Sequence, residues 1–213
     1  MNENKLNKTY LRTIQYWFED GIAELGIGGL FLLLGIYFYL QATLENGFLA
    51  DLLSASFVLI FIGGWYLAQY FIRSLKERIT FPRTGYVAYK FDKNNKKILR
   101  IALAIIVGAL VSAALLMFFS SRPLGIDNIM PAATGLAIAI VLGVMGLYTG
   151  LPRFYIPAVF SLLCGVGLTM SGIENILGTA FAYLATALVL LVTGAIVFRR
   201  YLNTNPAPAD GQQ

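Results

Sequence analysis

The chain has 213 residues, of which 58% are hydrophobic and only 13% are charged. Soluble domains carry about 25% charged residues because their surfaces face water, so this composition indicates one compact domain whose surface faces lipid. Histidine is absent and Cys164 is the single cysteine, which excludes His-based acid–base catalysis, imidazole metal ligands and an intramolecular disulfide.

Residues 1–20 precede the first long apolar run and have a two-sided helical pattern. Apolar and aromatic residues lie on one side and mostly basic or amide residues on the other: Leu6, Tyr10, Leu11, Ile14, Trp17 and Phe18 against Lys5, Lys8, Arg12 and Gln15. This pattern is typical of an amphipathic interfacial helix lying on the inner leaflet. The alternative is a plain cytoplasmic extension of the first span. The apolar run that follows is too long for a signal-peptide core and has no small-x-small cleavage site after it.

Six apolar stretches are long enough to cross a hydrocarbon core about 30 Å thick, which takes roughly 17–25 helical residues. They are residues 21–40, 53–72, 101–119, 129–149, 154–170 and 176–198. The sequence therefore predicts an all-α integral membrane protein, a six-transmembrane-helix bundle at residues 21–198. Only residues 150–153 separate the fourth and fifth stretches, so a single re-entrant unit is the alternative there. Residues 199–213 are predicted to form a disordered cytoplasmic tail.

Lysine and arginine are distributed unevenly around these spans. With the N-terminus inside, all of the 16 basic residues except Arg122 fall in cytoplasmic segments. The predicted outer loops instead carry Glu45, Asp51, Asp127 and Glu174. This asymmetry follows the positive-inside rule and predicts that both termini are cytoplasmic, in the plasma or bacterial inner membrane. Because the basic residues flank apolar segments, the net charge of +5 does not indicate a nucleic-acid partner.

Glu24 is the acidic residue that lies clearly within a predicted span, one turn into residues 21–40. It shares a helix face with Gly21, Gly28 and Gly35, so we expect it to face protein or a water-filled crevice, where an intramembrane carboxylate is tolerated. One hypothesis is a proton or cation site. The favoured hypothesis is a carboxylate near the inner interface, satisfied by water or by a base such as Arg12.

Small residues at helix-packing intervals continue in the later spans. They are Gly135, Ala139 and Gly143 in the fourth span, Ser161, Gly165 and Thr169 in the fifth, and Gly178, Ala182 and Thr186 in the sixth. The favoured interpretation is close approach of helix backbones. Lining of a narrow cavity is the alternative.

The predicted cytoplasmic loop at residues 73–100 is strongly basic. Two short runs, residues 79–81 and 86–91, flank Pro82-Arg83-Thr84-Gly85, which is typical of a turn, so a short hairpin is one interpretation. No phosphate-loop consensus is present. We expect the loop to lie on an anionic membrane surface, and its candidate contacts for lipid or phosphate are Arg78, Arg83, Thr84, Lys93, Lys96 and Lys97.

Two stretches of sequence carry a resemblance to a known class of protein. The run Lys-Glu-Arg-Ile-Thr-Phe-Pro-Arg-Thr-Gly-Tyr-Val at residues 76–87, with Tyr-Trp-Phe-Glu-Asp-Gly at residues 16–21, resembles bacterial multi-pass membrane proteins that lack an assigned function. The similarity covers the first half of the chain and implies no catalytic residue. In size and predicted topology, though in no motif, the chain also resembles the substrate-binding subunits of energy-coupling-factor transporters.

These features favour a non-catalytic interaction, regulatory or accessory membrane module that packs against its own copies or a partner. A small transport component is the alternative, and a lipid-headgroup enzyme comes third. Transport needs polar groups near mid-membrane, with candidates Ser56, Ser112, Thr134, Ser161 and Thr186. An enzyme needs acid–base groups at an interface, with candidates Glu19, Asp20, Glu24, Asp92 and Glu174. The sequence predicts no catalytic residue, metal or cofactor; the expected partners are anionic inner-leaflet lipids and a second copy or a membrane protein.

Overall fold

The structure is a computed structural model, and it describes residues 15–44, 47–84 and 129–206 of the chain. The described residues are helical, with no strand among them. The elements are α2 (Ile22–Thr43), α3 (Phe48–Ala55), α4 (Phe57–Leu75), the π-helical segment η1 (Lys76–Thr80), α5 (Phe81–Thr84), α7 (Met130–Thr149), the 3₁₀ turn η2 (Pro152–Phe154), α8 (Tyr155–Met170) and α9 (Asn175–Thr204). Residues 15–18 form a further helical turn before α2.

Five of these helical segments are long and apolar enough to cross a membrane: Ile22–Thr43, Phe57–Arg83, Met130–Thr149, Pro152–Met170 and Asn175–Thr204. This is the organisation of a multi-pass membrane protein. They correspond to five of the six predicted spans, and the remaining one, residues 101–119, lies outside the described residues. The fourth and fifth predicted spans are separate helices, each of sufficient length to cross by itself.

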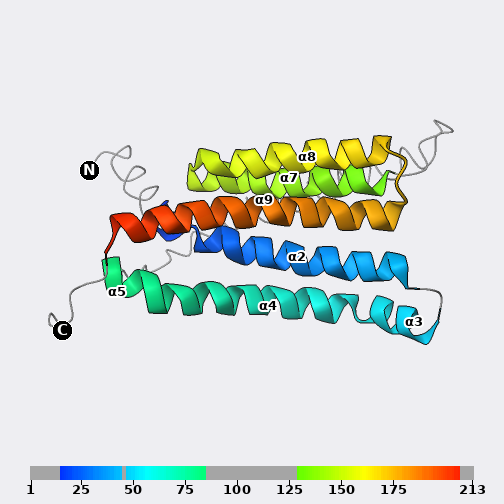
Figure 1. Ribbon diagram of the computed structural model, residues 1–213, viewed down its shortest axis with the longest axis horizontal. Coiled ribbons are helices and arrows are strands. Elements are labelled where there is room, and N and C mark those ends of the chain that lie inside the picture. The colour runs from blue at the N-terminus through cyan, green and yellow to red at the C-terminus, as the bar shows by residue number, and fades with distance from the viewer. Residues whose placement is uncertain (1–14, 45–46, 85–128, 207–213) are drawn as a thin grey trace, which may run out of the picture.

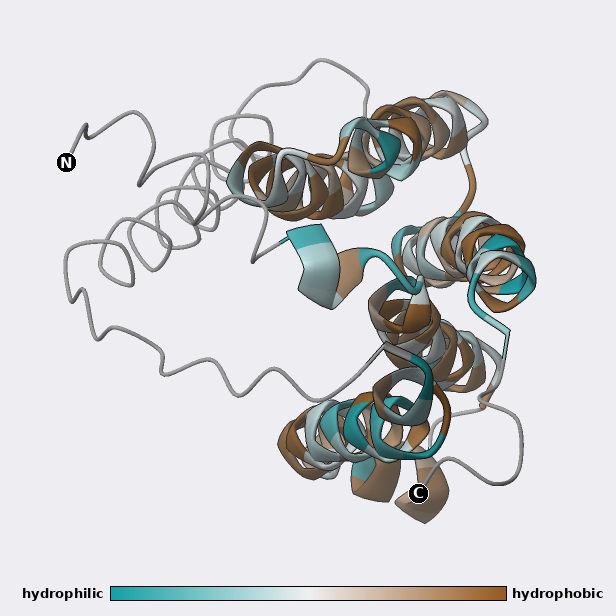
Figure 2. Ribbon diagram, turned by 90° about the vertical axis from the view of Figure 1, so that its left-hand side faces the viewer, coloured by the Kyte–Doolittle hydropathy of each residue, from teal (hydrophilic) through white to brown (hydrophobic). Residues whose placement is uncertain are grey.

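The helices form a bundle in which α2 and α9 occupy the middle (Figure 1). Helix α4 packs on the other side of α2, and the α7–α8 hairpin packs against α9. Viewed from one end, hydrophilic residues gather at the near ends of the helices, with long hydrophobic stretches behind them (Figure 2). The helix ends at this face of the bundle contain the charged residues described below.

The contact between α2 and α9 depends on glycines. A Cβ added to Gly28 would lie 3.0 Å from the Leu191 side chain, and one added to Gly35 would lie 2.7 Å from Leu184. On the facing helix, a Cβ added to Gly194 would lie 3.1 Å from the Cβ of Glu24. Residues seven apart share one face of a helix, so these glycines form a stripe along which the two backbones approach closely.

The α7–α8 hairpin is held by a second close approach. A Cβ added to Gly135 would clash with the carbonyl oxygen of Ser161, whose hydroxyl donates to the Gly135 carbonyl at 3.2 Å. Nearer the open end of the hairpin, the backbone N–H of Ala132 donates to the Thr169 hydroxyl at 3.0 Å. Lipid offers no hydrogen-bond partners, so such contacts between spans replace those that water would supply.

The structure differs from the sequence predictions at two helix ends. The predicted hairpin is contradicted in its first half, because Ile79 and Thr80 lie in η1 and Phe81 begins α5. Its second half, residues 86–91, lies outside the described residues. At the other end of the chain, α9 continues through Thr204, beyond the predicted end of the span at residue 198 and into the predicted tail. Tyr201 is buried there and extends the packed face of the helix.

Candidate functional site: a buried charge cluster

Four charged side chains converge at one end of the bundle: Asp20 and Glu24 at the start of α2, Lys76 in η1 and Arg153 in η2. Asp20, Glu24 and Lys76 are exposed by only 0%, 3% and 1%. Charged residues are almost never buried to this extent unless they are paired, because removing an ion from water costs several kcal/mol or more. We call these four residues the charge cluster.

The Lys76 ammonium has two hydrogen-bond acceptors and one aromatic ring as partners. Its Nζ lies 2.5 Å from Asp20 Oδ2 and donates to the Trp17 carbonyl at 2.6 Å. The same Nζ lies 4.5 Å from the centre of the Trp17 ring, which is a cation–π contact. Thr80 donates its hydroxyl to Asp20 Oδ2 at 3.0 Å. Asp20 and Lys76 therefore form a buried and hydrogen-bonded ion pair between α2 and η1.

Pro82 gives a local reason for the π-helical geometry of η1. Proline lacks an N–H, and in a regular α-helix its ring would clash with the carbonyl of the residue four positions earlier, here Arg78. The helix is wider in the turn before the proline, where the Phe81 N–H donates to the Lys76 carbonyl five residues back. Within this segment both Lys76 and Thr80 reach Asp20.

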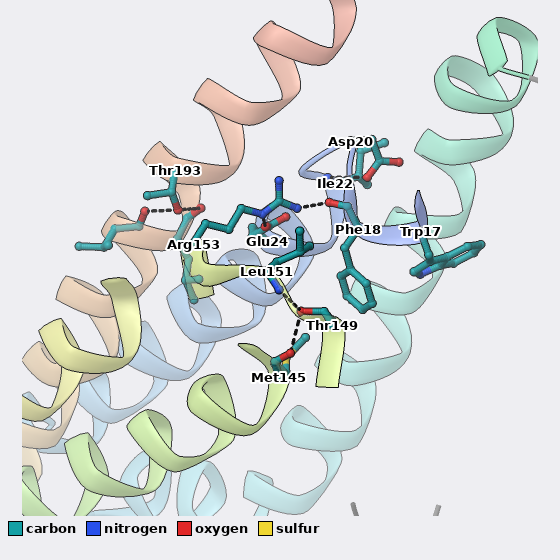
Figure 3. Close-up of polar contacts among 12 residues, drawn as sticks. Trp17, Phe18, Asp20, Ile22, Glu24, Met145, Thr149, Leu151, Arg153 and Thr193 are labelled. Carbon is teal, nitrogen blue, oxygen red and sulfur yellow. Dashed lines mark hydrogen bonds and ion pairs between the residues drawn. The ribbon is translucent and has the colours of Figure 1, made fainter. Parts of the chain in front are cut away.

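Arg153 connects the α7–α8 turn to α2 in the same way. Its Nε lies 2.6 Å from Glu24 Oε1, and its Nη2 donates to the Phe18 carbonyl. Figure 3 shows the guanidinium lying over Glu24 and extending to Phe18. The pair has Coulombic contact but poor hydrogen-bond alignment, because neither oxygen of Glu24 nor Nε of Arg153 has a hydrogen bond of good geometry with any described atom. Glu24 thus keeps unused hydrogen-bonding capacity inside the protein.

The cluster surrounds a break in the chain at Gly21. This glycine has a φ of +74°, and an added Cβ would lie 2.7 Å from the Gly194 carbonyl oxygen. A left-handed glycine is the usual way in which a helix ends. Before the break, Lys76 and Arg153 donate to the carbonyls of residues 17 and 18, at the end of the helical turn. Across the break, Asp20 Oδ1 accepts the N–H of Ile22, the first residue of α2, at 3.1 Å.

Helix dipoles favour this distribution of charge. Cations stabilise the carbonyl end of a helix and carboxylates stabilise the amide end. Here each cation contacts a carbonyl that precedes Gly21 and also a carboxylate at the start of α2. These contacts fix residues 15–24 to both η1 and the α7–α8 turn.

The structure places the other predicted site residues as follows. Gly21, Gly28 and Gly35 meet α9, Gly135 meets α8, Ala139 is half-buried in α7, and an added Cβ at Gly143 would meet no described atom within 4 Å. Arg78 is exposed, whereas Arg83 donates from Nη1 to the Asn205 carbonyl at 3.0 Å. Thr84 ends α5, and Lys93, Lys96 and Lys97 lie outside the described residues.

Sequence reasoning singled out Glu24 but missed three members of the cluster as a site. Asp20 was considered only as an interfacial acid, and Lys76 and Arg153 only as basic residues that orient the spans. The signal for Arg153 was its position as the one cation in a turn of a few residues between two apolar spans. The proposed base for Glu24, Arg12, lies outside the described residues, and Arg153 is the base that contacts it.

Charge also distinguishes the two ends of the bundle. The seven basic residues in the described part of the chain all belong to the helix ends around the charge cluster: Arg73, Lys76, Arg78, Arg83, Arg153, Arg199 and Arg200. The described helix ends on the opposite side contain the acidic residues Asp51 and Glu174. The bundle therefore has one basic end, although the cluster itself holds two carboxylates and two cations.

No protein-family model, curated protein or solved structure matches this chain. The resemblance to bacterial multi-pass membrane proteins of unassigned function therefore stays a prediction.

Proposed function

We propose that the chain is a non-catalytic, regulatory or accessory membrane module that works by associating with its own copies or with a partner membrane protein. The observation that carries the proposal is the pairing of Asp20 with Lys76 and of Glu24 with Arg153. A buried carboxylate held by a cation from another element contributes to the fixed arrangement of the helices. The same carboxylate is not presented to a substrate.

The acidic residues available to a lipid-headgroup enzyme support the same choice. Asp20 and Glu24 are buried, Glu19 is exposed beside them, and Glu174 belongs to the opposite end of the bundle. A general acid and a general base that act as a pair must both lie within hydrogen-bond reach of one substrate. In the described part of the chain these four do not meet at one accessible place.

Three of the five hydroxyls considered for a transport path also have backbone partners. Ser56 donates to Leu53 at 2.7 Å, Ser161 donates to Ala158 at 2.9 Å, and Thr186 donates to Ala182 at 2.8 Å. Such bonds to the preceding turn satisfy a hydroxyl inside its own helix. Ser112 lies outside the described residues.

The proposed orientation places the basic end in the cytoplasm, with both termini on that side. Its support is the segregation of charge between the two ends, because cytoplasmic helix ends are enriched in lysine and arginine. Under this orientation the charge cluster lies at the cytoplasmic ends of the spans, and Asp51 and Glu174 lie at their outer ends.

A small transport component is the second candidate, and Glu24 is the observation that favours it. Its carboxylate is buried within a candidate span and keeps hydrogen-bonding capacity unused by described residues. Intramembrane carboxylates of this kind occur along ion and proton pathways.

Native mass spectrometry of the full chain, extracted with its surrounding lipid, separates the two candidates. The module predicts a mass above that of the monomer, from further copies or a partner in fixed stoichiometry, which Glu24→Gln leaves unchanged. A monomer carrying one small solute, lost on Glu24→Gln, would overturn the module and favour transport.

A further inference from the structure

The basic residues at the basic end differ in the partners that their side chains already have. Lys76 and Arg153 are neutralised by the buried carboxylates of the charge cluster, and Arg83 donates to the Asn205 carbonyl. Arg73 is exposed but pairs with Glu77, its Nε 2.9 Å from Oε1. The remaining three, Arg78, Arg199 and Arg200, are exposed, and their side chains have no ion pair or hydrogen bond with any described residue.

These three arginines lie on two elements at one end of the bundle. Arg78 is in η1, and Arg199 and Arg200 are in the last turns of α9. Helix α5 follows η1, and the bond from Arg83 to Asn205 joins α5 to the end of α9. Figure 1 shows α5 and the end of α9 at the same end of the bundle. We define Arg78, Arg199 and Arg200 as the arginine surface.

The arginine surface follows the apolar parts of α4 and α9. In α9 the apolar stretch ends at Phe198, so Arg199 and Arg200 lie in the polar last turns of the candidate span Asn175–Thr204. Trp17 belongs to the same end and is 40% exposed. Tryptophan is enriched where the hydrocarbon core meets the headgroups, with its ring in the apolar layer and its N–H toward water.

We propose that the arginine surface binds anionic phospholipid headgroups. The phosphodiester of a phospholipid accepts two parallel hydrogen bonds from a guanidinium, and the net negative charge of a lipid such as phosphatidylglycerol distinguishes it from a zwitterionic one. Among the described residues at this end, Glu77 pairs with Arg73, the carboxylates of the charge cluster are buried, and Glu19 is the exposed acid without an ion pair, which the three arginines outnumber. The surplus positive charge at this end therefore belongs to the exposed arginines.

This assignment adds to the lipid contacts expected from sequence, of which Lys93, Lys96 and Lys97 lie outside the described residues. Arg78 remains, Arg83 is occupied by the protein backbone, and Arg199 and Arg200 are added. It does not depend on the proposed function, because either a module or a transport component can hold lipid at this surface.

The test uses the full chain reconstituted in vesicles of phosphatidylcholine with or without phosphatidylglycerol, and native mass spectrometry counts the lipids retained after extraction. Both leaflets have the same composition, so the result is independent of orientation. Each cation near an anionic surface changes partitioning by about fivefold. The wild type should retain phosphatidylglycerol over phosphatidylcholine, and Arg78→Gln/Arg199→Gln/Arg200→Gln should lower that preference by tenfold or more.

Two further variants keep the result interpretable. Arg73→Gln/Glu77→Gln removes an exposed ion pair from the same end without changing net charge, and it should retain phosphatidylglycerol as the wild type does. Replacing the three arginines with lysine keeps the charge, so it should keep most of the preference even if the glutamine variant fails to fold. Equal retention of the two lipids by the wild type, or loss of preference in the charge-matched control, would overturn the proposal.

Discussion

Replacing Lys76 with methionine tests whether the buried ion pairs hold the basic end of the bundle together. Methionine fills similar space without a charge, so the variant leaves the Asp20 carboxylate 0% exposed and without its cation. Removing one partner of a buried pair costs about 3–5 kcal/mol. The Trp17 carbonyl also loses its donor, a net loss of about 1 kcal/mol. The Thr80 bond to Asp20 is unchanged, so we expect a total loss of about 4–6 kcal/mol in the free energy of unfolding.

A double-mutant cycle separates the ion pair from loss of packing. Asp20→Asn alone should be about as costly as Lys76→Met, because it leaves a buried ammonium. The double variant has no buried charge, so it should lose only about 1–2 kcal/mol, well below the sum of the single losses. Arg73→Met is the control, since that arginine is 80% exposed and its pair with Glu77 contributes less than about 1 kcal/mol.

The measurement is reversible unfolding of the full chain in mixed detergent micelles with increasing dodecyl sulfate, followed by tryptophan fluorescence. A Lys76→Met variant as stable as the Arg73→Met control would refute the reasoning. So would a double variant whose loss equals the sum of the single losses, because the two residues would then not interact.

The same assay checks three further predictions. Gly21→Ala should destabilise by about 1–3 kcal/mol, because alanine adds both positive-φ strain and a contact with the Gly194 carbonyl; wild-type stability would show that the backbone relaxes there freely. Gly135→Ala should destabilise by about 1–3 kcal/mol through its clash with α8. Gly143→Ala, in open space, should be neutral or stabilising by up to about 1 kcal/mol. Equal effects of the two substitutions would contradict the close approach of α7 and α8. Arg153→Gln should cost about 3–5 kcal/mol and be partly rescued by Glu24→Gln, and absence of rescue would separate the two residues.

The apolar runs predicted the positions of most described spans because lipid imposes a simple requirement. A helix in hydrocarbon must be apolar on nearly every side, so run length alone locates it. The predicted span at residues 129–149 agrees with α7, and the one at residues 154–170 agrees with α8, within a residue at each end. The predicted packing face of Gly21, Gly28 and Gly35 likewise lies against α9.

The helix ends could not be predicted from the same pattern. Helix η1 continues past the apolar run because Lys76 and Thr80 bind Asp20, and α5 follows with Arg83 bonded to Asn205. These partners are 56, 60 and 122 residues apart in sequence. A polar segment that follows a span has no local signal of whether it turns away or remains helical.

The candidate site was predictable only as a single residue. Glu24 is recognisable because a carboxylate inside a span is rare. Its partner depends on which turn lies beside α2, and that order of helices around the bundle is not contained in hydropathy. Arg153, in the turn between α7 and α8, was therefore counted among the charges that orient the spans rather than as the base that neutralises Glu24.

Side-specific labelling of single cysteines tests most directly the central claim that the described helices cross the membrane with their basic end in the cytoplasm. In a Cys164→Ser background, cysteines replace Asp51 and Glu174 at one end and Glu19 and Asn203 at the other, all of them exposed positions. An impermeant thiol reagent added to intact cells should label positions 51 and 174, and label 19 and 203 only after permeabilisation. Labelling of position 203 in intact cells, or protection of position 174, would contradict the account.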